Sequence, residues 1–144
     1  MSDQQPKVHN LKQIALVFAG FFILAMVYFF QQDLTLPISD YMSPNGEFIV
    51  NRTVRLVLND LACLLIVYAI FRKQKYLKVG FLIFLLELLV ILPVYLVFKL
   101  SMEGDSEISS PLLSQVHRLI VNPMLMILLM IAFLYQRIRQ GHVL

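Results

Sequence analysis

The fold of this chain is decided by residues 110–137, SPLLSQVHRLIVNPMLMILLMIAFLYQR. A helix over residues 111–135 rises about 1.5 Å per residue and can therefore cross the roughly 30 Å hydrocarbon core of a membrane. Its first half nevertheless carries polar side chains, and a charge at bilayer depth costs at least about 2.5 kcal/mol. The segment predicts a membrane helix whose polar groups need partners on other helices: Ser114, Gln115, His117, Arg118 and Asn122.

The composition is that of an integral membrane protein. Of the 144 residues, 59% are hydrophobic and only 15% are charged, and the mean hydropathy is +0.76. Soluble domains are about half apolar and about a quarter charged. No basic patch has the size or the interleaved aromatic residues that nucleic-acid binding needs. We therefore expect the lipid bilayer as a partner and do not expect nucleic acid.

The chain offers few residues for cofactor chemistry. Cys63 is the single cysteine, so no disulfide can form within the chain. Of the three histidines only His117 falls inside a predicted helix, which makes a haem held by two imidazoles or a histidine-built zinc site hard to assemble. We therefore expect no cofactor and no metal.

The chain predicts an all-α membrane protein, a bundle of four transmembrane helices in a single membrane domain over residues 1–144, with tails at 1–12 and 137–144. The helices follow the long apolar runs: 14–30, 53–71, 79–98 and 111–135. Three prolines are expected to shape them: Pro93, Pro111 and Pro123. Pro93 frees a carbonyl and bends the third helix, and Ser110-Pro111 starts the fourth as N-cap and first-turn proline.

Small residues predict a close helix contact. Ala15 and Ala19, four residues apart, lie beside Gly20 in the first helix. Such a face lets a neighbouring backbone approach closely inside a membrane.

The lysines and arginines orient the bundle. The two tails and the connection at 72–78 together hold eight of them, whereas the other two connections hold only Arg52 and Lys99. Positively charged connections face the cytoplasm. We therefore expect both termini in the cytoplasm. Four tyrosines fall near predicted helix ends, where interfacial anchors are expected: Tyr28, Tyr68, Tyr95 and Tyr135.

The buried polar residues are expected to form one network. At 100° per residue, Arg55, Asn59 and Asp60 fall within a little under half of the circumference of the second helix. With both termini inside, they share a layer below the outer surface with the polar half of the fourth helix, and Glu87 lies within reach of long arginine side chains. Two arginines balance two acids, as burial demands. The expected network is Arg55, Asn59, Asp60, Glu87, His117, Arg118 and Asn122.

Three interpretations of this network remain open. It can hold the helices together, because polar residues inside membranes act as glue. It can serve transport, with Asp60, Glu87 and His117 as titrating sites of a proton or small-ion pathway in a homo-oligomer. It can serve an intramembrane cysteine transpeptidase or protease with the Cys63 thiol and the His117 imidazole. We expect no enzyme, because a lone cysteine on a helix is usually a small hydrophobe.

Short motifs resemble those of a known family. They are RLVLN at 55–59, IVYAIF at 66–71 before a basic turn, and RLIVNP at 118–123, which runs on to AFLYQ at 132–136. They resemble the small membrane proteins encoded beside exosortases in Bacteroidota, such as the exosortase F and exosortase X system-associated proteins. The resemblance covers about residues 50–137.

This resemblance implies a non-catalytic protein of the bacterial inner membrane. Its partner would be an exosortase, a multi-pass enzyme that processes the C-terminal sorting signals of exported proteins near the outer face of that membrane. The matching site residues would be Arg55, Asn59, Arg118 and Asn122. The family's pattern has two arginines where this chain has His117-Arg118, so His117 departs from it.

Overall fold

The described part of the chain is helical. The computed structural model describes the backbone of residues 5–30, 43–102 and 110–141, and side chains within those ranges from residue 11 to residue 140. The helices are α1 (Gln5–Phe29), α2 (Pro44–Phe71), α3 (Gln74–Leu86), η2 (Glu87–Ile91), α4 (Leu92–Met102), α5 (Pro111–Val121) and α6 (Met124–Gly141). No strand occurs in these ranges, which confirms the all-α prediction there.

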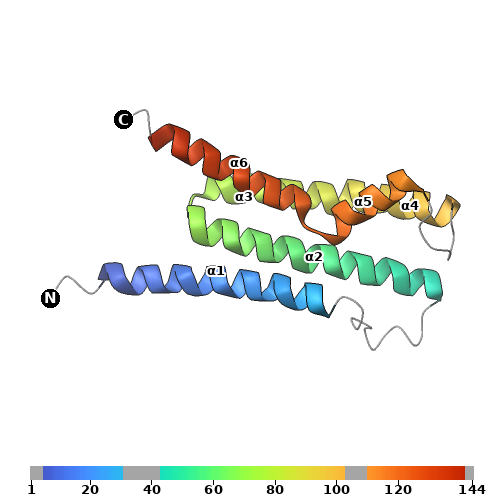
Figure 1. Cartoon of the computed structure of the whole chain (residues 1–144), viewed down its shortest axis with the longest axis horizontal. Coiled ribbons are helices and arrows are strands. Elements are labelled where there is room, and N and C mark those ends of the chain that lie inside the picture. Colours follow the sequence, from blue (N-terminus) through green and yellow to red (C-terminus); the bar gives the residue numbers. More distant parts are fainter. Residues whose placement is uncertain (1–4, 31–42, 103–109, 142–144) are drawn as a thin grey trace.

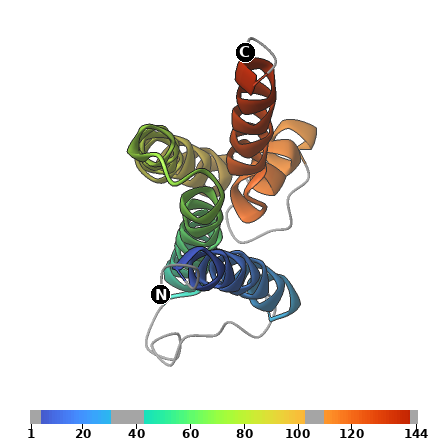
Figure 2. The ribbon, with the colours of Figure 1, turned by 90° about the vertical axis from the view of Figure 1, so that its left-hand side faces the viewer.

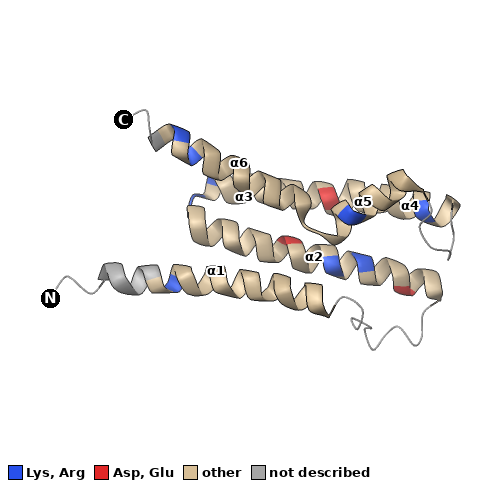
Figure 3. Cartoon of the chain, in the orientation of Figure 1, with Lys and Arg blue, Asp and Glu red and all other residues tan. Residues whose placement is uncertain are grey.

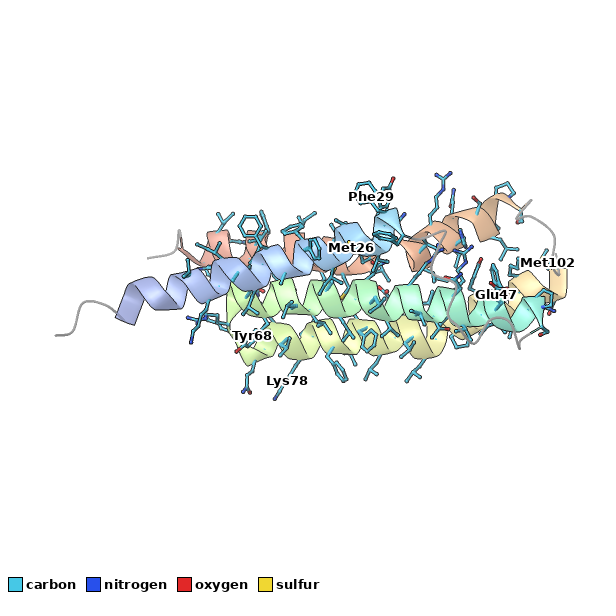
Figure 4. The ribbon with its side chains drawn as sticks, turned by 90° about the horizontal axis from the view of Figure 1, so that it is seen from below. Met26, Phe29, Glu47, Tyr68, Lys78 and Met102 are labelled. Atoms are coloured by element: carbon cyan, nitrogen blue, oxygen red, sulfur yellow. The ribbon has the colours of Figure 1, made fainter. Side chains whose placement is uncertain are left out.

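The helices run up and down along one long axis (Figure 1). α1 begins and α6 ends at the same end of the bundle. Seen along the axis, α2 occupies the centre, with α1 on one side and with α3 and α6 on the other (Figure 2). We call the opposite end the distal end. It carries Glu47 and Met102, whereas Tyr68 and Lys78 lie toward the end where α1 begins (Figure 4).

Helix α2 begins nine residues earlier than the predicted residue 53. Ser43 is its N-cap, with a side-chain oxygen that accepts a hydrogen bond from the Gly46 N–H at 3.3 Å, and Pro44 occupies the first turn. A proline there loses no helical hydrogen bond. The 28 residues of α2 reach about 42 Å at 1.5 Å per residue. Arg52 and Arg55 therefore lie well inside a helix rather than at its start.

The third predicted helix is one rod with a widened turn. The chain from Gln74 to Met102 is continuous helix, and the turn Glu87–Ile91 is π-helical, with the Leu92 N–H bonded to the Glu87 carbonyl five residues back. Pro93 follows directly and has no N–H to give to the carbonyl of residue 89. The π turn thus adapts the backbone just before the proline, and it begins at the buried Glu87.

The fourth predicted helix is broken. A single helix over 111–135 is wrong, because α5 ends at Val121, α6 starts at Met124, and the two axes bend by 62°. Pro123 lies in the break, where the Met124 N–H bonds only two residues back, to the Asn122 carbonyl at 2.7 Å. Proline prevents continuation because it lacks an N–H and disfavours a helical residue before it. The break places the end of α5 against α2.

Among the described helices, α1 makes extensive contacts with α2 only. Gly20 faces α2, and a Cβ added there would lie 2.5 Å from Ile66 Cγ1 and 3.1 Å from the Ala62 carbonyl oxygen. Of the predicted small face, Gly20 is buried, whereas Ala15 and Ala19 are exposed. A hydrogen bond from the Gln13 amide to the Ala69 carbonyl at 3.3 Å adds a second contact between the helices.

An aromatic cluster closes the bundle at the end opposite the distal end. The Tyr76 ring lies 4.9 Å from that of Phe71 and 4.6 Å from that of Phe133, centroid to centroid. Arg137 donates to the Ile70 carbonyl at 3.4 Å. Residues 5–12 and 137–141, predicted as tails, are helical extensions of α1 and α6. The rest of the tails and the connections at 31–42 and 103–109 lie outside the described residues.

Three helices are long and apolar enough to cross a membrane, and the bent pair α5–α6 makes a fourth if it counts as one span. The first three are Leu11–Phe29, Pro44–Phe71 and Gln74–Met102. Large apolar side chains cover the outside of the bundle, such as Phe22, Leu82 and Ile131. Such a surface suits lipid, not water.

Candidate functional site at the helix break

A cavity of about 290 Å³ lies where α5 breaks into α6. α1, α2 and the break itself form its walls. Its polar lining comes mainly from Arg55, Asn59 and Asn122. The other walls are apolar and come from Leu24, Val27, Tyr28, Val121, Pro123 and Ile127. The two motifs RLVLN and RLIVNP therefore meet at one cavity, although they are about 60 residues apart in the sequence.

Asn59 ties α2 to the break. Its side-chain amide donates a hydrogen bond of 2.8 Å to the carbonyl of Val121, the last residue of α5. The last carbonyls of a helix have no partner within the helix, and a buried one without a partner destabilises the fold. Asn59 supplies that partner, so the broken helix and the polar residue of α2 depend on each other.

Arg55 lies beside Asn59 without a matching anion. Its side chain is 8% exposed, and its Nε has no hydrogen-bond partner in the part of the chain that the structure describes. Another cation, Arg52, acts on it with a like charge. A buried guanidinium is costly unless it is paired or hydrogen-bonded. The cavity therefore holds an unsatisfied positive charge.

More cationic residues gather toward the distal end. The Arg52 guanidinium and the Lys99 ammonium both lie over the ring of Phe48, at 5.0 Å and 4.7 Å from its centroid. Such contacts stabilise a cation on the negative face of an aromatic ring. Tyr95 Oη and His117 Nδ1 share a hydrogen bond of 2.7 Å that joins α4 to α5, and the imidazole feels the charges of Arg52, Arg55 and Lys99.

The two buried acids lie away from this cationic region and meet each other. Asp60 of α2 and Glu87 at the start of η2 are each 1% exposed, and their side chains are near enough to act on each other electrostatically. A carboxylate only accepts hydrogen bonds, so a bond between two carboxyl groups requires a proton on one of them. With both ionised, Asp60 Oδ1, Asp60 Oδ2 and Glu87 Oε1 have no donor among the described residues. A proton on one of the two acids would supply a donor for the other, and we interpret the two residues as an acid pair that shares a proton.

The structure thus separates the residues of the predicted network. Arg55, Asn59, Asp60 and Glu87 are buried and His117 is half-buried, whereas Arg118 and Asn122 are exposed. The prediction of burial is wrong for those last two residues. The expected ion pairs between arginines and acids do not form within the described ranges. Figure 3 shows basic and acidic positions at different points along α2. Arg55 and Asp60 are five residues apart there, so their side chains point about 140° apart around the helix.

Cys63 and His117 belong to different regions. Cys63 is 0% exposed and lies near the acid pair, which acts on its thiol electrostatically. His117 lies with the cationic residues and bonds to Tyr95. The structure does not bring this thiol and this imidazole together. Among the described residues, no three His, Cys, Asp or Glu side chains lie close enough to hold a metal ion.

Sequence reasoning missed three polar partners of this region. Arg52 and Lys99 were placed in connections because α2 and α4 extend further than their apolar runs. Tyr95, expected as an interfacial anchor, is 1% exposed and holds His117. The spacing of Phe48, Arg52 and Lys99 offered one signal: residues 48 and 52 are four apart and share a helix face once the helix is known to start at Pro44.

A second and larger cavity lies between α4 and α5. Its volume is about 530 Å³ and its lining is almost wholly apolar. It offers shape but few groups that could specify a ligand, so the cavity at the helix break is the better candidate. Searches of protein-family models, of curated proteins and of solved structures found no match to this chain.

Proposed function

We propose that this chain is a non-catalytic accessory protein of an exosortase-type protein-sorting system in a bacterial inner membrane. One observation supports the proposal best. The motifs that carry the resemblance to exosortase-associated proteins converge: Asn59 bonds to Val121, and Arg55, Asn59 and Asn122 line one cavity. Motifs that matched only by chance would not be expected to lie next to each other in the folded chain.

The exposed residues of the break supply the surface for the partner. Arg118 is exposed, and Asn122 lies one helical turn after it at the end of α5. A multi-pass partner can offer carboxylate or carbonyl oxygens to both, and hydrogen bonds to a charged group stabilise a complex by about 1.5–3 kcal/mol. In this proposal both termini are cytoplasmic, so the distal end and the break face outward.

Native membranes provide the test. We expect the chain to co-purify with an exosortase, and Arg118→Leu to reduce the recovered partner by about tenfold or more. Leu134→Ala is the control, because Leu134 is likewise exposed on the same broken span. Since neither side chain is buried, both variants should accumulate normally. Equal recovery of the partner with the two variants would count against the proposal.

The acid pair favours a second candidate function, proton or small-ion transport by an oligomer. Asp60 and Glu87 are both buried in the middle of their helices, where they act on each other as an acid pair. Such pairs serve as proton relays in pumps and transporters. Purified chain in liposomes should then conduct protons, and Asp60→Asn combined with Glu87→Gln should abolish the flux. Liposomes that stay proton-tight with the unmodified chain would remove this candidate.

A further inference from the structure

The cavity at the helix break has the charge of an anion-binding site. Arg55 lines it and is more than nine-tenths buried, with an Nε that has no partner in the described part of the chain. Arg52, one helical turn earlier on α2, acts on it with a like charge. Neither Asp60 nor Glu87 lines this cavity, and Asp60 points about 140° away from Arg55 around α2. Among the described residues, no counter-charge faces this cavity, so an anionic ligand would complete it.

The backbone adds to this preference. The first turn of α6 borders the cavity through Pro123 and Ile127. The helix dipole makes the start of α6 partly positive, although Pro123 has no N–H and the Ile127 N–H already bonds to the Pro123 carbonyl. The partly negative end of the α5 dipole lies at the same break and would repel an anion. The last carbonyl of α5, that of Val121, already accepts a hydrogen bond from the Asn59 side-chain amide. Asn122 contributes a side-chain amide to the same wall.

The remaining walls indicate that the anion carries apolar chains. Leu24 and Val27 of α1 and Ile127 of α6 present hydrocarbon to the cavity. Their side of the bundle is covered by exposed apolar residues such as Met26 and Leu128, which suit acyl chains. The cavity also lies level with the last turn of α1, beside Tyr28, where an apolar span ends and headgroups begin.

We infer that this cavity binds the phosphate of an anionic membrane phospholipid, with Arg55 as the charged ligand, Asn122 as a hydrogen-bond donor and the partly positive start of α6 beside them. The acyl chains then lie along the apolar side chains of Leu24, Val27 and Ile127. About 290 Å³ accommodates a phosphate with its glycerol backbone. The lipid site and the proposed partner surface share Asn122, but the partner contact is tested through Arg118, which does not line the cavity.

Thermal unfolding of the purified full chain in a non-ionic detergent tests the site. We expect phosphatidylglycerol to raise the unfolding midpoint by about 3–5 °C, phosphatidylcholine to act more weakly, and inorganic phosphate to have no effect at the same concentration. Native mass spectrometry should show one retained phosphatidylglycerol per chain. An equal shift with inorganic phosphate would overturn the lipid assignment in favour of a soluble anion.

Two variants and one control separate this site from general attraction between lipid and basic protein. Arg55→Gln removes the cation, and Asn122→Asp places a carboxylate beside it at an exposed position where folding should persist. Each should weaken phosphatidylglycerol binding by about tenfold or more. Arg52→Gln is the control, because Arg52 lies one turn earlier on Phe48 and does not line the cavity. Equal loss in all three variants, or no shift with any lipid, would overturn the inference.

Discussion

The acid pair and the cavity at the helix break solve the same physical problem in different ways. Asp60 and Glu87 are buried between α2 and the π turn and satisfy each other through a shared proton. Arg55 is almost as buried, yet a guanidinium stays charged and cannot be satisfied by losing a proton. It therefore requires an anion. The acid pair needs no partner from outside the chain, whereas the Arg55 guanidinium is left for an anion to complete.

This difference separates structure from function within one small bundle. A pair that is complete needs no ligand, and its removal should act on stability. A site that is incomplete needs a ligand, so substitutions there should change ligand binding more than they change the stability of the fold. The following predictions, from the largest expected effect to the smallest, are designed to break or sharpen that contrast.

The largest effect is expected from breaking the acid pair. Glu87→Leu leaves Asp60 buried without a partner, which should lower the free energy of unfolding by about 2–3 kcal/mol. Unfolding in mixed micelles with increasing dodecyl sulfate measures this. The double variant Asp60→Asn with Glu87→Gln keeps a hydrogen bond without a shared proton and should lose less than about 1 kcal/mol. If the double variant is as unstable as Glu87→Leu, the shared-proton geometry is wrong.

A slightly smaller loss is expected from moving α1. Gly20→Val places side-chain atoms against Ile66 and the Ala62 backbone, where a Cβ alone already approaches within 2.5 Å of Ile66 Cγ1. Overpacking of this kind costs about 1–3 kcal/mol. It should also widen the cavity, since α1 forms one wall, while the acid pair stays intact.

The matched control for this variant is Ala19→Val. Ala19 is the neighbouring residue on the exposed side of α1, so the extra methyl groups meet no helix. Lipid retention and stability should fall for Gly20→Val and stay near the unmodified values for Ala19→Val. Both readouts use native mass spectrometry and thermal unfolding on the same preparations.

The hydrogen bond across the break should matter less. Asn59→Ala leaves the Val121 carbonyl without its partner at the end of α5, with an expected loss of about 1–2 kcal/mol. Amide hydrogen exchange should then rise in the last turn of α5 and the first turn of α6, and not around Glu87. Faster exchange spread evenly over the whole bundle would mean that the break is not a separate local unit.

The smallest effect is expected at the distal end. Tyr95→Phe removes the hydroxyl that bonds to His117 Nδ1 and should lower the free energy of unfolding by about 1 kcal/mol. Phosphatidylglycerol binding should be unchanged, because Tyr95 does not line the cavity at the break. A loss of lipid binding in this variant would show that the two polar regions are coupled.

Several local features were predictable from the sequence. The same helix-start signature occurs at two positions, and it led to a predicted helix start at only one of them. Ser110-Pro111 predicts a helix start, and α5 does begin at Pro111. Ser43-Pro44 is the same signature and begins α2, although the Asn45-Gly46 that follows is typical of a turn. The extra turns of α2 and α4 moved Arg52 and Lys99 from expected loops into helices. Local composition alone could not decide between turn and helix, because the deciding contacts lie with other helices.

The meeting of Asp60 with Glu87 was beyond sequence reasoning. Pairing by opposite charge predicted arginine partners for both acids, but Arg55 and Asp60 lie about 140° apart on α2 and face different neighbours. Which neighbour each one meets depends on the rotation of α3 and on the π turn before Pro93. A proton on one acid then removes the need for an arginine.

By itself, the sequence determined that the chain is helical and that at least three helices are long and apolar enough to cross a membrane, because run length and hydropathy are local properties. Only the tertiary structure decided where the fourth apolar run breaks and which polar groups meet. The physical reason is that a side chain's direction depends on how each helix is rotated and shifted against its neighbours. Those shifts are set by contacts between distant residues, such as Gly20 on Ile66 and Asn59 on Val121.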